Sequence, residues 1–222
     1  MEQIESIESL LKKSLKTVED VYDKFPWQDK NAYGNWLAQT FYFVSHSTRL
    51  LCASAARFSL SQHKLHQRYV EHLSEEKGHE VLAKNDLKNL GFSAEEFPEL
   101  APTAAFYQSQ YFMIEHIHPS ALFGYILVLE GISVSRGKQA LALTEEAFGR
   151  KCSTFWHVHA NEDEDHLPKA LAQIEGMQGL EREAVIKSMI QSADMYVRIL
   201  KTIELQSKQM PAETMTLAAA VG

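Results

Sequence analysis

The chain has 222 residues, enough to bury a substantial core in one large domain or two small ones. Hydrophobic residues make up 45% of it and charged residues 23%, as in soluble globular proteins, and a formal net charge of −7 argues against nucleic-acid binding. No apolar run approaches the roughly 20 residues that cross a bilayer, so we expect no membrane span. The first residues lack the basic and apolar regions of a signal peptide. We therefore expect a cytoplasmic protein in which Cys52 and Cys152 are reduced core thiols.

Apolar residues recur at helical spacing along most of the chain, and no stretch alternates as a β-strand does. The pattern predicts seven helices, separated by prolines, glycines and polar turns. They span residues 3–23, 34–58, 62–90, 103–117, 120–148, 150–175 and 180–207. We therefore predict an all-α protein, with one domain over residues 1–208 and a flexible tail over residues 209–222.

The helix predicted over residues 62–90 carries His72, Glu76 and His79 at positions i, i+4 and i+7. On a continuous helix that spacing places all three side chains within one narrow face. Two imidazoles and a carboxylate are donors that iron, zinc and manganese accept.

A single acidic residue, Glu130, lies inside the helix predicted over residues 120–148, after a run that is apolar on all sides. Such a helix is expected to be buried, and burying a bare carboxylate costs several kcal/mol. Glu130 must then be paired, protonated or bound to a metal, and the histidines elsewhere favour the metal. The alternative is a buried ion pair with Arg136 or Arg49.

The i, i+4, i+7 pattern recurs in the helix predicted over residues 150–175, as His159, Asp163 and His166. The alternative is a solvated surface run, because residues 162–165 are four consecutive acids. A surface run does not account for a histidine on either side at these offsets.

Three predicted helices thus offer three carboxylates and three imidazoles, a plausible ligand set for two divalent ions. These candidate ligands are Glu76, His79, Glu130, His159, Asp163 and His166, with His72 as a further candidate. Ferritin-type bundles use two Glu-x-x-His motifs, and this chain has one, so that topology fits poorly. A zinc hydrolase is also less favoured, because catalytic zinc is usually held by three protein ligands rather than six.

Three motifs in this order, over roughly residues 30–200, resemble the heme-oxygenase-like di-iron oxidases and oxygenases, whose relatives include TenA, PqqC and the chlamydial CADD-type proteins. The motifs are the acidic run of residues 75–80 leading to residues 86–91, the lone Glu130 in its apolar helix, and the His-x3-Asp-x2-His of residues 159–166. The resemblance implies a single-domain, seven-helix bundle without heme, built around two iron ions of which one is labile. It implies the ligands named above, with Glu76 placed as in the alkene-forming fatty-acid decarboxylases of the group and His72 as an extra or supporting residue.

The resemblance further implies a non-heme iron oxidase or oxygenase that uses O2 to oxidise a small organic substrate such as a fatty acid, an amino acid or an amine. An electron donor and a second copy of the chain are expected partners. Candidate substrate contacts, with ordinary core packing as the alternative for the tyrosines and the histidine, are Arg49, Arg57 and Arg136 for a carboxylate, and Tyr42, Tyr125 and His46 for the pocket wall.

Two other functions stay open at this point. One is a metal-free hydrolase or small-molecule-binding protein of the same fold. Its TenA-type form needs a nucleophilic cysteine beside a glutamate, and neither cysteine matches that motif. The other is an α-helical protein that only binds a partner.

Overall fold

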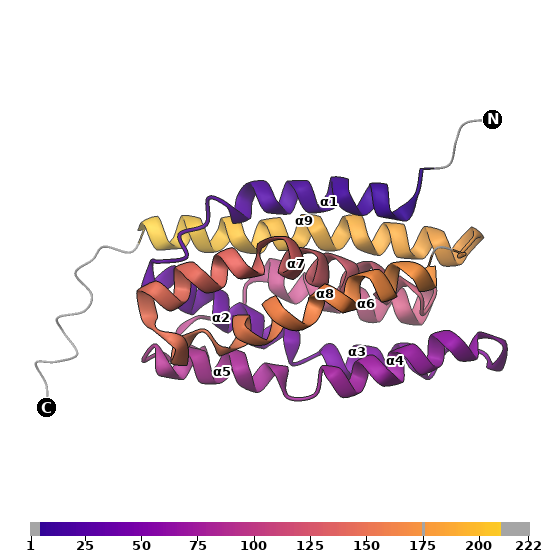
Figure 1. Cartoon of the computed structure of the whole chain (residues 1–222), viewed down its shortest axis with the longest axis horizontal. Coiled ribbons are helices and arrows are strands. Elements are labelled where there is room, and N and C mark those ends of the chain that lie inside the picture. Colours follow the sequence, from indigo (N-terminus) through magenta and orange to yellow (C-terminus); the bar gives the residue numbers. More distant parts are fainter. Residues whose placement is uncertain (1–4, 175, 210–222) are drawn as a thin grey trace, which may run out of the picture.

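The computed structural model describes residues 5–174 and 176–209, without the side chains of residues 161–166 and 169. The predicted tail over residues 209–222 therefore lies almost wholly outside the described part of the chain. Within that part the structure has nine α-helices, three short 3-10 turns and no strand (Figure 1). The helices are α1 (Ile7–Tyr22), α2 (Lys30–Val44), α3 (Ser47–Ala55), α4 (His63–Glu75), α5 (His79–Asn89), α6 (Ala101–His116), α7 (Ala121–Phe148), α8 (Thr154–Ile174) and α9 (Gly179–Gln209).

The predicted all-α class is confirmed, but two of the seven predicted helices are each broken into two. The helix predicted over residues 34–58 breaks between α2 and α3, where the Ser45 hydroxyl donates to the Phe41 carbonyl oxygen 2.6 Å away and competes with the helical backbone. The helix predicted over residues 62–90 breaks between α4 and α5 at Gly78, whose φ is +93°. Glycine adopts this left-handed conformation without steric penalty.

The long helices run roughly along one axis, with α1 and α9 side by side along one edge and α4 and α5 along the opposite edge (Figure 1). Helix α7 lies between them and packs on both α8 and α9. At Gly124 the absence of a side chain lets the backbones of α7 and α9 come close together. None of the helices in the described residues is both long and apolar enough to span a membrane.

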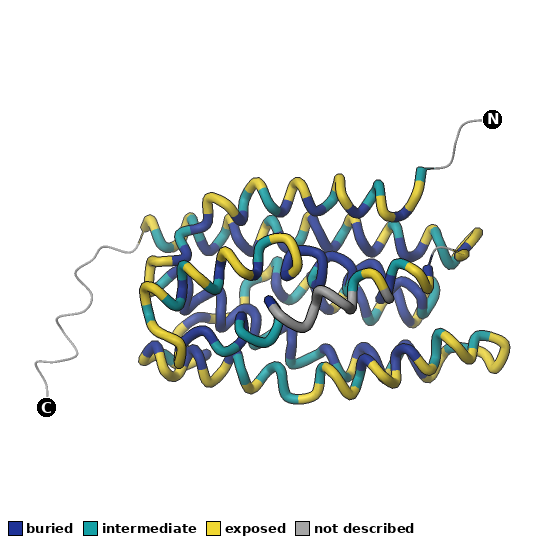
Figure 2. Tube along the Cα trace, viewed as in Figure 1, coloured by how far each residue is buried: buried dark blue, intermediate teal, exposed yellow. Residues whose placement is uncertain are grey.

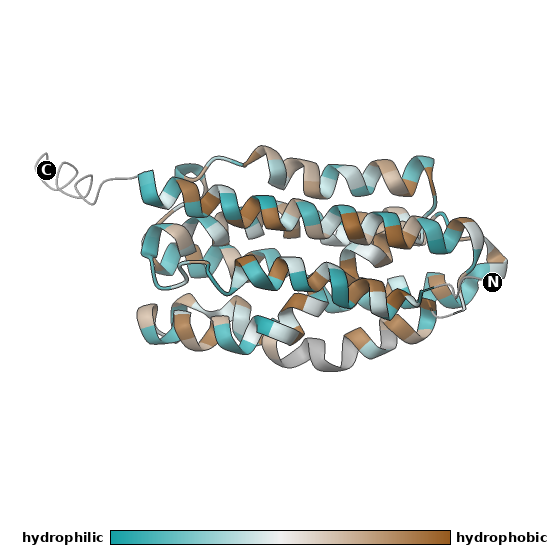
Figure 3. Ribbon diagram, turned by 90° about the horizontal axis from the view of Figure 1, so that it is seen from above, coloured by the Kyte–Doolittle hydropathy of each residue, from teal (hydrophilic) through white to brown (hydrophobic). Residues whose placement is uncertain are grey.

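Each outer helix buries one stripe of side chains. Helix α1 begins after Ser6, whose hydroxyl accepts a hydrogen bond from the Ser9 N–H, and its apolar residues at every third or fourth position are buried. Its outward face is exposed, whereas α7 is buried along most of its first half (Figure 2). Hydrophobic and hydrophilic residues accordingly alternate around the helices when the bundle is viewed from above (Figure 3).

The core is rich in aromatic residues, and all three tryptophans lie in one cluster. The ring centroids of Trp36 and Trp156 are 4.7 Å apart and stacked, and Trp27 packs edge-on against both rings. Cys152 is buried as expected, but Cys52 is exposed, so the expectation of two core thiols was wrong for Cys52. Position 52 falls on the outward side of the short α3, away from the core.

Candidate metal centre

The break between α4 and α5 positions two of the predicted ligands. Glu76 is the residue that ends α4, with its N–H bonded to the His72 carbonyl oxygen 2.9 Å away, and His79 is the first residue of α5. The prediction that His72, Glu76 and His79 share the face of one continuous helix was wrong, because the chain turns at Gly78.

Glu76, His79 and His159 converge despite that turn. Each offers one ligand atom, and these three atoms all lie within 4.8 Å of one another. Helix α5 packs against α8, which brings His159 to the other two. The rings of His79 and His159 lie edge to face, with centroids 4.7 Å apart.

Hydrogen bonds orient the His159 ring. Its Nδ1 lies 2.8 Å from the Phe155 carbonyl oxygen, one helical turn earlier, and the two rings stack with centroids 4.0 Å apart. A carbonyl oxygen only accepts, so Nδ1 carries the proton. The lone pair is then on Nε2, the arrangement in which a neutral histidine binds a metal.

The turn that carries Phe155 is itself anchored to α5. Buried Asp86 accepts hydrogen bonds from the Thr154 hydroxyl at 2.6 Å and from the Phe155 N–H at 2.8 Å, and so caps the start of α8. Burial raises the pKa of Asp86, while these hydrogen bonds act in the opposite direction.

His72 lies on the other side of Glu76, with its Nε2 3.8 Å from Oε1 of that carboxylate. Arg68 Nη1 and His72 Nδ1 each lie 3.1 Å from the same oxygen of Glu75. The hydrogen bond from His72, aided by Arg68, lowers the pKa of Glu75 to about 2. Arg68 Nη2 also lies 3.2 Å from His72 Nδ1, so Arg68 and Glu75 together hold the ring with its Nε2 toward Glu76.

Glu130 is buried in α7, with 6% of its surface exposed. Its Oε1 lies 3.8 Å from His72 Nδ1, so the His72 ring stands between Glu130 and Glu76. The alternative ion pair with Arg136 was wrong: Arg136 binds Asp23 and Glu19 on α1.

Glu76 is charged at neutral pH. Burial raises its pKa, but His79, whose Nδ1 is 3.6 Å from Oε1, and the other nearby imidazoles outweigh burial and lower the pKa to about 2. The carboxylate is therefore available as a metal ligand over the whole physiological range.

The donor set fits iron. One carboxylate and two imidazoles with open positions form the arrangement that non-heme Fe(II) oxygenases use. The remaining predicted ligands, Asp163 and His166, stand on α8 four and seven residues after His159, and their side chains lie outside the described part of the chain.

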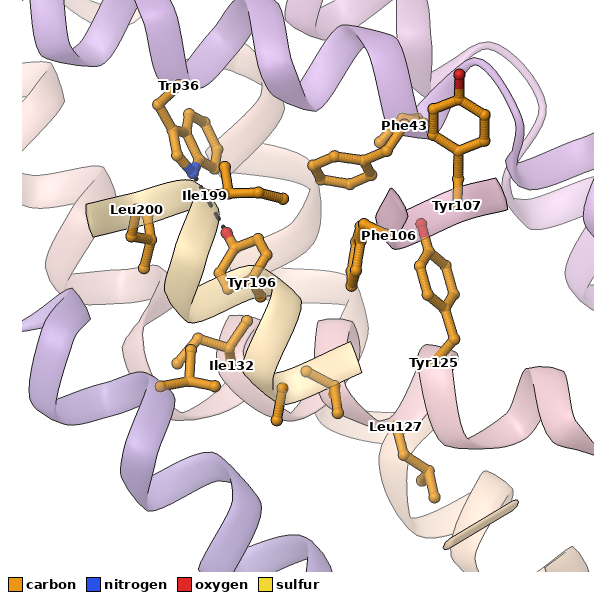
Figure 4. Packing of buried hydrophobic residues seen from close by; sticks show 14 of the residues in the cluster. Trp36, Phe43, Phe106, Tyr107, Tyr125, Leu127, Ile132, Tyr196, Ile199 and Leu200 are labelled. Carbon is orange, nitrogen blue, oxygen red and sulfur yellow. Dashed lines mark hydrogen bonds between the residues drawn. The ribbon is translucent and has the colours of Figure 1, made fainter. Parts of the chain in front are cut away.

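A mostly apolar cavity adjoins these groups. About 700 Å³ of it, part of which opens to solvent, is free of protein atoms, and its wall includes His72, Glu76, Glu130 and His159. Most of the remaining wall consists of aromatic and aliphatic side chains from α2, α3, α7, α8 and α9. The Trp36 indole N–H donates to the Tyr196 hydroxyl, 3.2 Å away, at this wall (Figure 4).

Of the predicted substrate contacts, Tyr125 lines the cavity, and burial raises its pKa well above the usual range. Tyr42 donates to the carbonyl oxygen of Ala94, and His46 stacks on Tyr107 and hydrogen-bonds Tyr111. For His46 the alternative, a packed histidine with a hydrogen-bond partner, is the correct one.

The predicted arginine contacts lie elsewhere. Arg49 is exposed and bonded to the Ser45 carbonyl oxygen, Arg57 pairs with Glu115, and Arg136 is held by α1. The expectation that they line the pocket was therefore wrong. Each finds its partner on the outside of the bundle.

Sequence reasoning named His72 as a supporting residue but missed the roles of its partners Arg68 and Glu75. These three residues are spaced i, i+4, i+7 on α4, which was a readable signal for a hydrogen-bonded triad. Asp86 carried no such local signal, because its partners are 68 and 69 residues away in the chain.

The chain matches known proteins over most of its length. Residues 34–197 match the model of a family described as iron-containing redox enzymes. A crystal structure of a domain of unknown function with a heme oxygenase-like fold, from Shewanella denitrificans, superposes with a TM-score of 0.79 at 18% identity, over 93% of this chain and 95% of that one. The predicted heme-oxygenase-like fold is confirmed. No curated protein is similar enough to match.

Proposed function

Because the chain belongs to the family of iron-containing redox enzymes, we propose that it is a non-heme di-iron oxidase or oxygenase that uses O2 to oxidise a small organic substrate. The convergence of Glu76, His79 and His159 beside an apolar cavity carries the proposal. These groups combine the donor chemistry of a non-heme iron site with space for an organic molecule next to it.

The groups around the cluster support a site for two ions rather than one. Glu76 is near the His79–His159 pair on one side and His72 on the other, and Glu130 lies beyond the His72 ring. A carboxylate in that position can serve two ions at once. Glu130, His72 and the α8 residues Asp163 and His166 would complete the ligand set.

Bound iron would supply the site at which O2 is activated. The chain's own residues hold that site: Phe155 fixes the tautomer of His159, and Glu75 with Arg68 holds the ring of His72 in place. The wall is mostly apolar, and such a wall would limit the access of water and so reduce side reactions. Ionised Glu76 offsets part of the positive charge of the metal.

The alternative is a metal-free hydrolase or binding protein of the same fold. A thiol nucleophile in the cavity is disfavoured, because neither Cys52 nor Cys152 lines it and burial raises the pKa of Cys152. Low-pKa, accessible thiols are the reactive ones.

The test is anaerobic loading with Fe(II), followed by removal of loose metal and analysis of iron per chain. We expect close to two irons per chain and rapid O2 consumption when air is admitted. His159→Ala should lose both. Fewer than one iron per wild-type chain, with no O2 uptake, would favour the metal-free alternative.

A further inference from the structure

Three residues of the cavity wall each carry a buried polar atom that has no hydrogen-bond partner within the described part of the chain. These atoms are the Thr40 hydroxyl, the Tyr125 hydroxyl and the Trp156 indole N–H. Their residues are 1%, 3% and 1% exposed. Buried polar groups are nearly always hydrogen-bonded, so three exceptions around one cavity call for a ligand or water that pairs with them.

The hydroxyls of Thr40 and Tyr125 belong to one aromatic neighbourhood. Thr40 lies one turn before Phe43 on α2, and the Phe43 ring packs edge-on against Phe106 with centroids 5.2 Å apart. Phe106 in turn packs against Tyr125, with ring centroids 4.6 Å apart. In Figure 4 the hydroxyl end of Tyr125 lies beside the Phe106 ring. Trp156 is stacked on Trp36, one turn before Thr40.

The chemistry of these atoms limits what they can bind. The Trp156 N–H is a donor only, whereas the two hydroxyls can both donate and accept. A ligand must therefore present an acceptor oxygen, with or without a proton of its own. Hydroxyl, ketone and amide groups all satisfy this requirement.

The charged residues of the cavity wall restrict the class of ligand further. Among the described residues that line the cavity there is no lysine or arginine, and Glu76 and Glu130 are on the wall. Away from the metal ligands, a substrate carboxylate would lie against an apolar wall without a basic side chain, which is strongly unfavourable. An uncharged group avoids this penalty.

We propose that Thr40, Tyr125 and Trp156 are specificity-determining residues that bind the uncharged oxygen of a predominantly apolar substrate. This inference rests on the proposed function and names its substrate class: an aliphatic or aromatic molecule with a hydroxyl or carbonyl group, rather than a free acid or an amine. The apolar body packs against aliphatic side chains of α3 and α7, including Leu51, Leu122 and Leu129.

The test uses three probes of one chain length, namely octanol, octanoate and octylammonium, on the full-length chain. Binding is followed by calorimetry and by the fluorescence of the wall tryptophans, both in metal-free protein and in protein loaded with Fe(II) without O2. We expect octanol to bind metal-free protein at least tenfold more tightly than either charged probe. Octanoate that binds the iron-loaded protein more tightly than octanol does would overturn the proposed substrate class.

The variants are Tyr125→Phe and Thr40→Val, with Thr40→Ser as the conservative change. Each lost hydrogen bond should weaken octanol binding about fivefold, and Thr40→Ser should retain the wild-type affinity. Tyr22→Phe is the matched control, because Tyr22 also carries a buried hydroxyl without a partner but does not line the cavity. It should leave octanol binding unchanged.

Equal or tighter binding of octanoate or octylammonium to metal-free protein would overturn the proposal. So would an octanol affinity that stays within twofold of wild type in both variants, or no binding of octanol at all. Thermal unfolding confirms that each variant is folded. Iron per chain is measured on the same samples: normal iron loading with no octanol preference refutes the specificity inference alone, while loss of iron from the wild type refutes the di-iron function.

Discussion

The imidazole rings of His79 and His159, which stand at the first residue of α5 and inside α8, lie edge to face with centroids 4.7 Å apart. Two imidazole rings at this distance gain little from each other in water. Together with Glu76 they form a cluster that we expect to stabilise the fold only when a cation is bound to it.

We therefore expect Fe(II) without oxygen to raise the midpoint of thermal unfolding of the wild type. At a free Fe(II) concentration of 100 times Kd the shift should be about 5–10 °C. His159→Ala should remove most of it, as measured by calorimetry under nitrogen.

His157→Ala is the control, because His157 is on the same helix and pairs with Glu145 Oε2 at 3.0 Å instead of joining the cluster. It should keep the full shift. Equal shifts in His159→Ala and the wild type would contradict this centre.

Gly78→Ala should reduce both stability and metal affinity. Alanine pays about 1 kcal/mol in the left-handed conformation that Gly78 adopts at φ +93°, although its Cβ would meet no atom within 4 Å. Strain at the turn displaces the adjacent Glu76 and His79, so Fe(II) binding should weaken on the order of tenfold.

Gly91→Ala separates the two effects. Gly91 has a φ of +88° at the other end of α5, and an added Cβ there is 3.9 Å from Lys30 Nζ, so the loss of stability should be similar. Its Fe(II) affinity, from competition titration against a coloured chelator, should equal that of the wild type. A parallel loss of affinity in Gly91→Ala would show that α5 as a whole, rather than the turn, sets the site.

The Arg68–His72–Glu75 triad makes stability depend on pH. The folded pKa of Glu75, about 2, is below its usual 4.5, so its contribution is present above pH 4.5 and is lost as the pH falls from about 4.5 toward 2. Glu75→Gln should be less stable than the wild type at pH 6, and the two stabilities should converge as the pH approaches 2. Urea denaturation at a series of pH values measures this. Because the Glu75 side chain is 36% exposed, solvent screens the interaction and the difference should be modest.

The exposed Glu71 on the same helix provides the comparison. Glu71→Gln should follow the wild-type pH profile. A Glu75→Gln profile parallel to that of the wild type between pH 6 and 2 would refute the assigned role of the triad.

Gly124→Ala should be among the most destabilising small substitutions in the chain. The new Cβ would be 2.5 Å from the Met189 backbone nitrogen and closer still to the Val185 carbonyl oxygen. Backbone atoms of α9 cannot move aside as a flexible side chain can, so we expect a loss of about 2–3 kcal/mol in the free energy of unfolding.

Gly176→Ala, whose Cβ would contact nothing within 4 Å, should change the free energy of unfolding by less than about 0.5 kcal/mol. Chemical denaturation of both variants checks the pair. A Gly124→Ala protein as stable as the wild type would mean that α7 and α9 do not meet as described.

The sequence predicted those features that depend on the periodicity of a single helix or on the chemistry of a single residue type. Periodicity predicted the helical stretches, and the chemistry of histidine and carboxylate selected Glu76, His79 and His159, which the structure brings together. The break at Gly78 was missed because a helix tolerates one glycine at a cost of about 1 kcal/mol, so residue type alone does not show whether the chain turns.

Contacts between distant segments were beyond local reasoning. Arg136 was expected at the pocket, but its partner Asp23 lies 113 residues earlier in the chain. The partnerless hydroxyls of Thr40 and Tyr125 stand out only when the three-dimensional surroundings are known, since neither residue belongs to a motif.

The backbone of Phe155 links the two histidine-bearing helices. Its N–H donates to Asp86 of α5, seven residues after His79, and its carbonyl oxygen accepts a hydrogen bond from His159 Nδ1. The separation of the two imidazoles is thus set by the apoprotein's own bonding. The conformational entropy of these two histidine side chains is therefore lost during folding and not when the metal binds. A change of metal should then leave the positions of α5 and α8 unchanged.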